Sequence, residues 1–216
     1  MKKICIILFS ALILSFVSCS GKDDFSTQNV SQLRENVFVY ENDDFFAEAF
    51  AEYREKEKAD DGFVGERKNF MIFRLRFKKK SFQSASIKFE TDGIKYENDF
   101  GFSPSSSYVS CETEVSSFPK SSFFAALDID GKEHTVEFVS VKNEGTLGCE
   151  KAIKECETKE KDRISEFIKD KSYEIRVRLI ENGGFNFYFV GYITENSSVS
   201  FLLDGITGEV LAVKEN

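Results

Sequence analysis

Apolar and polar residues alternate along much of residues 67–141, which is the pattern of half-buried β-strands. In FMIFRLRF, residues 70–77, the apolar side chains alternate with Arg74 and Arg76. Several such short runs are separated by turns that contain Gly or Ser. The pattern predicts a β-rich antiparallel region resembling a sandwich or half-barrel.

Two Asp-Gly pairs in this region are typical of tight hairpin turns. A two-residue loop at Asp92-Gly93 gives a register with one apolar face and one face of oppositely charged pairs, Glu90 with Lys95 and Lys88 with Glu97. The second pair, Asp130-Gly131, predicts another hairpin. Its two-residue register sets Asp128 against Glu133, so the charges support it less well.

A helical period follows a short β-like run at residues 36–40. Asn42 and Asp43 are suited to capping a helix. Apolar residues then recur at helical spacing, namely Phe45, Phe46, Ala49, Phe50 and Tyr53. We therefore expect an amphipathic helix that ends near KADDG, with its aromatic stripe in the core rather than in a binding motif.

A second helical segment begins after a boundary at residues 142–145 and runs to about residue 172. The strands that follow are divided by Gly- and Asn-containing turns. We therefore expect an α+β protein. Residues 35–143 would form a β-rich N-terminal domain with one amphipathic helix, and residues 144–216 a domain in which a helix packs on a small antiparallel sheet.

The two ends of the expected C-terminal domain, residues 144–216, resemble the PepSY-like family. The opening matches at Thr146, Leu147, Glu150 and Ala152, and the closing strand pair matches at Asp204, Thr207, Gly208, Glu209 and Val210. The resemblance covers residues 144–216 and implies a helix followed by three or four antiparallel strands. It also implies a binding or inhibitory role at the cell envelope, with a protease as one partner and without a catalytic residue.

One strand of this segment carries aromatic residues on both faces. Tyr188 and Tyr192 share one face, whereas Phe185, Phe187 and Phe189 share the other. A helix covers only one side of a sheet, so the second aromatic face needs another cover. Tyr188 and Tyr192 are the candidate protein-binding residues, because exposed apolar patches mark interaction sites. Packing against the N-terminal domain is the alternative.

The first residues have the pattern of an export signal. Lys2 and Lys3 precede an apolar run that is too short for a comfortable membrane span of about 20 residues. Ser18-Cys19 then resembles the lipobox of bacterial lipoproteins, although Phe16 stands where Leu is usual. The resemblance implies cleavage after residue 18 and acylation of Cys19. The polar residues that follow predict a flexible tether over residues 19–34. An ordinary cleaved signal is the alternative.

Composition and charge narrow the functional classes. The chain has 216 residues, 24 Phe and no Trp, so its core must rest on phenylalanine. The net charge of −8 becomes about −10 when residues 1–18 are removed, because they carry two lysines and no acid. Nucleic acid and anionic lipid repel such a chain, so we expect a membrane partner only through the lipid, and no nucleic-acid partner.

The residues give little sign of catalysis. His134 is the single histidine, and no nucleophile-elbow, zinc-protease or phosphate-loop motif occurs. Cys111, Cys149 and Cys156 have no metal-binding spacing, and the sequence leaves open whether they are paired. We expect a non-enzymatic envelope lipoprotein that binds or inhibits a protein, without cofactor or metal. A structural surface lipoprotein and a small-ligand carrier with an interdomain pocket are the alternatives.

Overall fold

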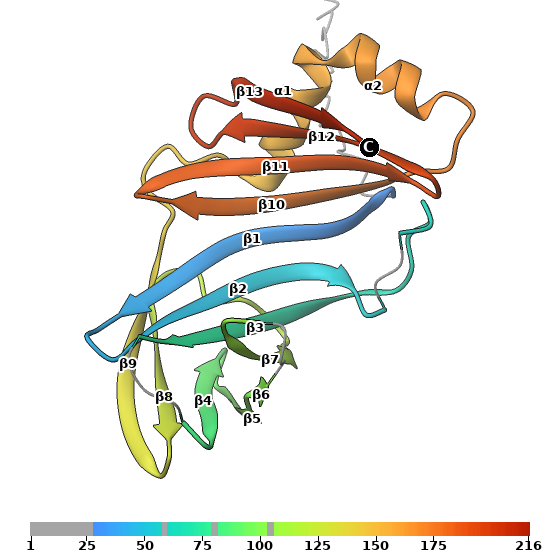
Figure 1. The fold of residues 1–216 in the computed structure, drawn as a ribbon. Coiled ribbons are helices and arrows are strands. Elements are labelled where there is room, and N and C mark those ends of the chain that lie inside the picture. Colours follow the sequence, from blue (N-terminus) through green and yellow to red (C-terminus); the bar gives the residue numbers. More distant parts are fainter. Residues whose placement is uncertain (1–27, 58–59, 79–81, 103–105) are drawn as a thin grey trace, which may run out of the picture.

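The computed structural model describes residues 28–57, 60–78, 82–102 and 106–216. The expected signal peptide, Cys19 and most of the expected tether lie outside these residues. Strands dominate the described chain, and two helices accompany them (Figure 1). In chain order, the elements are β1 (Val30–Glu41), β2 (Phe45–Glu55), β3 (Arg67–Phe77), β4 (Ala85–Thr91), β5 (Ile94–Asp99), β6 (Gly101–Phe102), β7 (Val109–Glu114), β8 (Phe123–Ile129), β9 (Lys132–Ser140), α1 (Cys149–Lys159), α2 (Lys161–Ile168), β10 (Glu174–Asn182), β11 (Phe185–Thr194), β12 (Ser197–Asp204) and β13 (Val210–Glu215).

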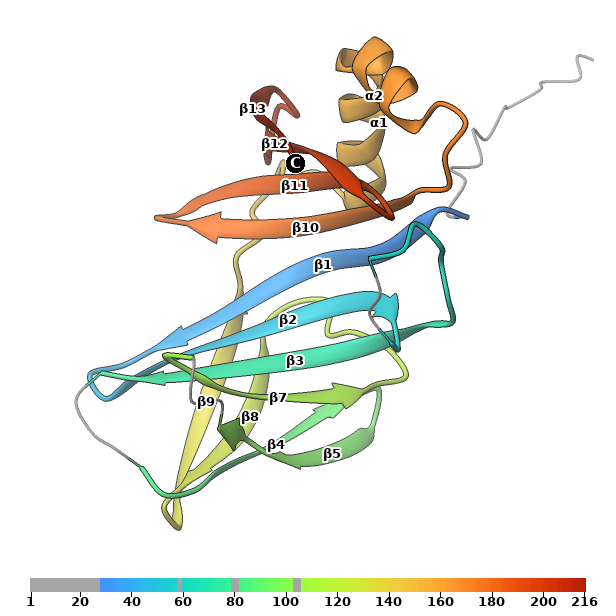
Figure 2. The same cartoon turned by 45° about the vertical axis from the view of Figure 1, so that its right-hand side comes forward.

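All of the described strands join one 13-stranded sheet that branches at β1. One path runs β13-β12-β11-β10-β1-β2-β3-β7-β6, and the other leaves β1 through β9, β8, β4 and β5 (Figures 1 and 2). The amide nitrogen Nδ2 of Asn98 on β5 donates to the Glu112 carbonyl oxygen on β7 at 2.7 Å. The strands β1–β9 therefore curl into a nearly closed, barrel-like arrangement, which we call the curled part.

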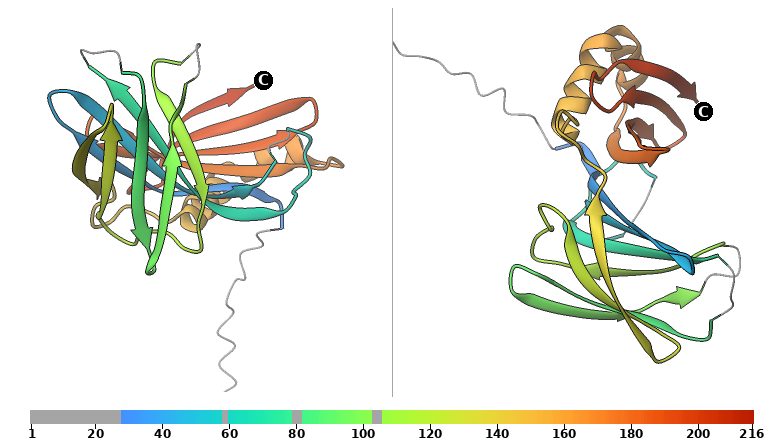
Figure 3. Two further views of the ribbon diagram at one scale, coloured as in Figure 1. Left: turned by 90° about the horizontal axis from the view of Figure 1, so that it is seen from below. Right: turned by 90° about the vertical axis from the view of Figure 1, so that its left-hand side faces the viewer.

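The expected α+β fold is wrong, and so is the expected PepSY-like domain with its own small sheet. The helices α1 and α2 and the antiparallel order β10-β11-β12-β13 do occur in residues 144–216. However, β10 pairs in parallel with β1, with Leu33 opposite Val177. The sheet therefore continues across the expected boundary at residue 143, and β1 lies at the waist between the two parts (Figure 3).

The helix expected after Asn42 is also wrong, because residues 45–55 form the strand β2. This strand pairs along its whole length with β1 on one side and β3 on the other. Its alanines at positions 47, 49 and 51 point into the curled part, where little space remains between the two neighbouring strands and β8–β9. The Asn42 side chain accepts hydrogen bonds from the backbone of Asp44 and Phe45, so it shapes a hairpin turn rather than a helix start.

The first strand begins earlier than the sequence suggested. Residues 30–34 were expected to belong to a flexible tether, but they form the start of β1 and pair with both β2 and β10. Val30 is fully buried, and Leu33 is 8% exposed. The pairing on both sides fixes this segment, although its sequence is polar.

The two Asp-Gly hairpins are confirmed in register. Lys88 lies opposite Glu97, and Asp128 lies opposite Glu133. Both turns have positive φ at the aspartate and the glycine, as two-residue hairpin loops require. The Asp128 carboxylate accepts a hydrogen bond from the Gly131 backbone at 2.9 Å. This bond to the turn explains why the like-charged pair is tolerated.

Two hydrophobic cores are present, one inside the curled part and one beneath the helices. The core inside the curled part is built on phenylalanine, as the composition predicted, and its rings make edge and stacked contacts. The second core lies between the helices and the strands β10–β12. Large buried aromatics of the first core are Phe38, Phe45, Phe73, Phe89, Phe123 and Phe138.

The turn before β13 leads to a prediction about Gly205. A Cβ atom at this position would lie 2.4 Å from the Asn186 carbonyl oxygen, and backbone cannot move aside easily. We expect Gly205→Ala to lower the free energy of unfolding by about 1–3 kcal/mol. Gly148→Ala is the matched control, because no atom lies within 4 Å of its added Cβ. Urea denaturation followed by circular dichroism measures both, and equal stabilities would contradict the expected clash.

Candidate functional site

Tyr188 and Tyr192, the binding residues expected from the sequence, both lie in the core beneath the helices. Tyr188 is fully buried and Tyr192 is 1% exposed. The Tyr188 hydroxyl donates to the Leu147 carbonyl oxygen just before α1, and the Tyr192 hydroxyl donates to Glu157 at 3.3 Å. Burial raises the pKa of Glu157 and of both tyrosines. Neither tyrosine is on an exposed surface, so the expected binding patch there is wrong.

The register of the β10–β11 hairpin explains this error. Leu179 lies opposite Tyr188, and Ile175 lies opposite Tyr192. Opposed residues share a face of the sheet. The tyrosines are therefore on the same face as the apolar residues of β10, and the helices cover them all together. The two-residue loop Gly183-Gly184 sets this register, so the sequence contains the information that places the tyrosines.

The opposite face of the sheet collects most of the arginines of the chain. The sequence has eight arginines, and strand register places six of them on this face. We call it the arginine face and define it by Arg34 on β1, Arg54 on β2, Arg74 and Arg76 on β3, and Arg176 and Arg178 on β10. The alternation in RLR at residues 74–76 and in RVR at residues 176–178 directs these side chains to one side.

A buried carboxylate organises the middle of this face. Glu52 is 1% exposed, and its oxygens contact Arg34 Nε at 2.7 Å and Gln32 Nε2 at 2.6 Å. Arg54 Nε lies 3.8 Å from the same carboxylate, and its terminal nitrogen is 2.7 Å from Glu112. These contacts join β1, β2 and β7 through side chains as well as through backbone pairing.

Aromatic rings hold the guanidinium groups in place. The Phe50 ring centroid lies 4.3 Å from the Arg34 guanidinium carbon and 4.8 Å from that of Arg74. Arg74 also lies 4.7 Å from the Tyr108 ring. Stacking of this kind leaves the N–H edge of a guanidinium available for hydrogen bonds in its plane.

Three arginines of the face lack an acidic partner. Among the residues that the structure describes, no carboxylate lies within ion-pair distance of Arg74, Arg76 or Arg178. Arg178 donates instead to the amide oxygen of Gln32 at 2.8 Å. Burial and the nearby charge of Arg34 lower its pKa. Glu48, directly opposite Arg74 in the β2–β3 register, offsets part of the charge of Arg74 and Arg76, so this part of the face keeps a net positive charge among the described residues.

Two hollows adjoin these arginines, one on each side of β1. The smaller, of about 140 Å³, is lined by Arg74, Arg76, Glu48, Phe46 and Tyr108, together with Ser107. Burial raises the pKa of Glu48, while the three arginines around it act in the opposite direction.

The larger of the two hollows, of about 410 Å³, lies across β10–β13 and includes Arg176, Arg178, Phe189 and Lys214. Its aromatic and cationic lining resembles that of the smaller hollow. Both therefore present guanidinium groups beside apolar surface, an arrangement suited to a ligand that combines negative charge with apolar groups.

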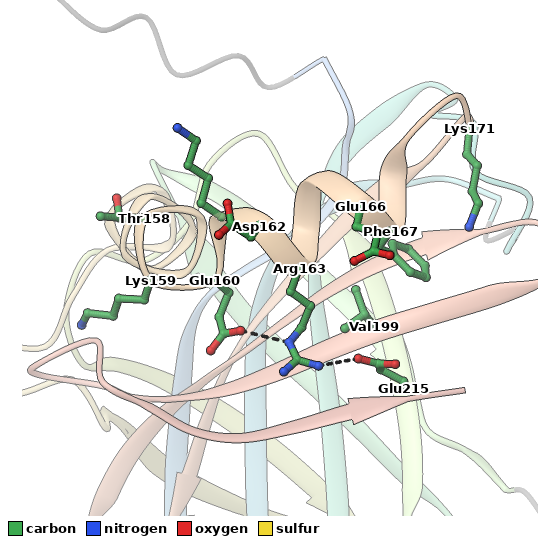
Figure 4. Close-up of a pocket in the computed structure, with 11 residues that line it drawn as sticks. Thr158, Lys159, Glu160, Asp162, Arg163, Glu166, Phe167, Lys171, Val199 and Glu215 are labelled. Carbon is green, nitrogen blue, oxygen red and sulfur yellow. Dashed lines mark hydrogen bonds and ion pairs between the residues drawn. The ribbon is translucent and has the colours of Figure 1, made fainter.

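Another pocket, of about 1050 Å³, lies between α2 and the strands β12 and β13 (Figure 4). Arg163 projects into it and is held between Glu160 at 3.1 Å and Glu215 at 2.6 Å. Lysines and acidic residues alternate around the remaining wall. Since its arginine is already paired with two carboxylates, this pocket is a weaker candidate for binding a charged ligand.

The other residues considered for chemistry pack against or within the cores. The His134 ring packs edge-on against Phe45, with centroids 5.7 Å apart. Cys111, Cys149 and Cys156 are free and buried, and burial raises the pKa of each thiol to about 12. In the described ranges, no group of three or more His, Cys, Asp or Glu could hold a metal ion. Nor is any described helix long and apolar enough to cross a membrane.

The fold and this surface define a strand-rich protein with a charged, aromatic sheet face. No protein-family model matches the chain, and no significant match was found among curated proteins or among solved structures.

Proposed function

We propose that this chain is a lipid-anchored protein of the cell envelope that binds a partner through the arginine face, without catalysing a reaction. The observation that carries the proposal is the set of three arginines without an acidic partner, Arg74, Arg76 and Arg178. Arg74 and Arg178 are half-buried and already oriented by their neighbours, which is typical of guanidinium groups on binding surfaces. The tyrosine-based surface expected from the sequence does not support this function, because both tyrosines are core residues.

The envelope location rests on the sequence of residues 1–19. The apolar run and the small residue before Cys19 support export followed by acylation, and acyl chains supply roughly 0.8 kcal/mol of membrane affinity per buried CH₂. The protease partner rested on the PepSY-like resemblance, and the observed fold removes its support. The arginine face directs the search toward partners of complementary charge instead.

Lipidation gives a direct prediction about Cys19. Cells that express the wild-type chain and are fed radiolabelled palmitate are expected to label it, whereas Cys19→Ser abolishes the label. Cys5→Ser is the matched control, because this second cysteine lies inside the expected signal and is removed with it. Autoradiography of the purified chain measures the result. Label retained in Cys19→Ser would overturn the proposed anchor.

Site-specific photo-crosslinking in living cells tests the binding function. Ile72 is on the arginine face opposite Phe50, and Phe124 is 65% exposed on the outside of the curled part. A photoreactive amino acid at position 72 is expected to give a discrete adduct with another molecule, and the same group at position 124 is not. Absence of an adduct at position 72, or the same adduct from both positions, would contradict binding through this face.

A further inference from the structure

The occupant of the arginine face can be specified further, on the condition that the proposed function holds. We infer that the face binds an extended, carboxylate-rich segment of a partner protein, with one carboxylate at Arg74 and Arg76 and another at Arg178.

The positive charge of the arginine face favours an anionic ligand. The chain as a whole is acidic, with a net charge of −8, yet six of its eight arginines are gathered on this face. Glu52 and Glu112 neutralise Arg34 and Arg54, while Arg176 pairs with Asp60 and Glu174. Glu48 offsets part of the charge of Arg74 and Arg76. The net positive charge that remains lies with these two arginines at one end of the face and with Arg178 at the other.

One guanidinium group at each end of the face is held by its neighbours. Arg74 lies between the rings of Phe50 and Tyr108, and Arg178 is fixed by Gln32 and lies 5.7 Å from the Phe189 ring. Less side-chain entropy is lost on binding when a guanidinium is already held in one orientation. A planar fork held in this way matches a carboxylate with two parallel hydrogen bonds.

The smaller hollow favours a singly charged group over a more highly charged one. Its volume of about 140 Å³ accommodates a side-chain carboxylate with its methylene groups, which Phe46 and Tyr108 can contact. Glu48 lines the same hollow and repels anions. The repulsion grows with ligand charge, so one carboxylate is favoured over a phosphate monoester, which carries a charge of about −1.5 to −2.

The spacing of the strands favours an extended segment. The two ends of the face lie on β3 and β10, which are separated by β2 and β1. Three strand spacings of about 4.8 Å place them at least about 14 Å apart, a span of about five extended residues. A folded acidic loop with adjacent carboxylates would reach only one end.

Fluorescence anisotropy with a labelled peptide of ten glutamates tests this inference. The protein is the mature chain, residues 19–216, with Cys19→Ser to keep it in solution. The peptide is expected to bind, and Arg74→Gln and Arg178→Gln are each expected to weaken binding about tenfold or more. Arg163→Gln is the matched control, because it removes an arginine outside the face, and it is expected to leave the affinity unchanged. Glu48→Gln removes the repelling charge and is expected to tighten binding.

Further arms distinguish charge from geometry and peptide from other polyanions. Arg74→Lys and Arg178→Lys keep the charge but lose the planar fork, so each should still weaken binding, even if a glutamine variant fails to fold. Ten glutamines, a single-stranded oligothymidine and vesicles with anionic phospholipid are the comparison probes. Tighter binding of oligothymidine or vesicles that depends on Arg74 would overturn the peptide assignment in favour of that class.

The two proposals can fail separately. No binding of the glutamate peptide, or equal loss in Arg163→Gln, overturns the acidic-segment inference. If the adduct at position 72 is nevertheless observed, the face still binds a partner, but one of different chemistry. Absence of both overturns the proposed function together with this inference.

Discussion

Replacing Glu52 by alanine is expected to lower the free energy of unfolding by about 3–5 kcal/mol. The carboxylate is 1% exposed and is the ion-pair partner of Arg34, whose side chain is 15% exposed. It also accepts a hydrogen bond from Gln32. Its removal leaves the Arg34 guanidinium half-buried without that partner and loosens the side-chain links between β1 and β2. A buried charge without its counter-charge is costly, because it has lost water without gaining a compensating contact.

Urea denaturation followed by far-ultraviolet circular dichroism measures this loss, since the chain has no tryptophan for fluorescence. Glu114→Ala is the control, because Glu114 pairs with Lys68 while about half exposed. Such exposed pairs contribute little, and we expect a change within about 0.5 kcal/mol. Equal losses in the two variants would show that Glu52 does not organise the centre of the arginine face.

Replacing Tyr188 by alanine is expected to lower the free energy of unfolding by about 3–5 kcal/mol as well. The ring is fully buried between β11 and α1, and its hydroxyl donates to the Leu147 carbonyl oxygen. The substitution therefore leaves a cavity under the helix and a carbonyl group without its donor. The amide hydrogens of α1 are expected to exchange faster as the helix loses its support.

The control for this prediction lies on the same strand. Phe185 is an aromatic residue of β11 that is 69% exposed, so Phe185→Ala should change stability by no more than about 0.5 kcal/mol. Chemical denaturation and hydrogen exchange measure both variants. A Tyr188→Ala protein as stable as the Phe185→Ala protein would contradict the assignment of Tyr188 to the core.

Local patterns predicted the hairpins and the second helical segment, because turn residues and spacing pointed to one structure in each case. The segment of β2 fits two periods. Phe45, Phe46, Ala49 and Phe50 match a helix, yet every second residue from Phe45 to Ala51 is also small or apolar. Pairing with β1 and β3 decides between the periods, and the residues of these partner strands lie outside the segment itself.

The candidate site could be predicted only in part. The alternation around Arg74 and Arg76 showed that these side chains share a face, but not that Arg176 and Arg178 join them. The arginines of β3 and β10 share one face because β1 pairs in parallel with β10, and no local sequence pattern indicates this pairing. The position of Tyr188, in contrast, follows from the Gly183-Gly184 turn, because a two-residue loop fixes it opposite Leu179.

The parallel pairing of β1 with β10 also has a consequence for the order of folding. The Ser31 hydroxyl and the Ile175 carbonyl oxygen lie at hydrogen-bond distance although the residues are 144 positions apart. During synthesis or export, residues 30–34 of β1 must therefore lack their partner on one side until β10 has emerged. Contacts between residues so distant in sequence make folding slow, and a strand edge that stays unpaired meanwhile is prone to aggregation. A chain shortened after residue 143 would keep β9 but leave this edge of residues 30–34 without its partner strand.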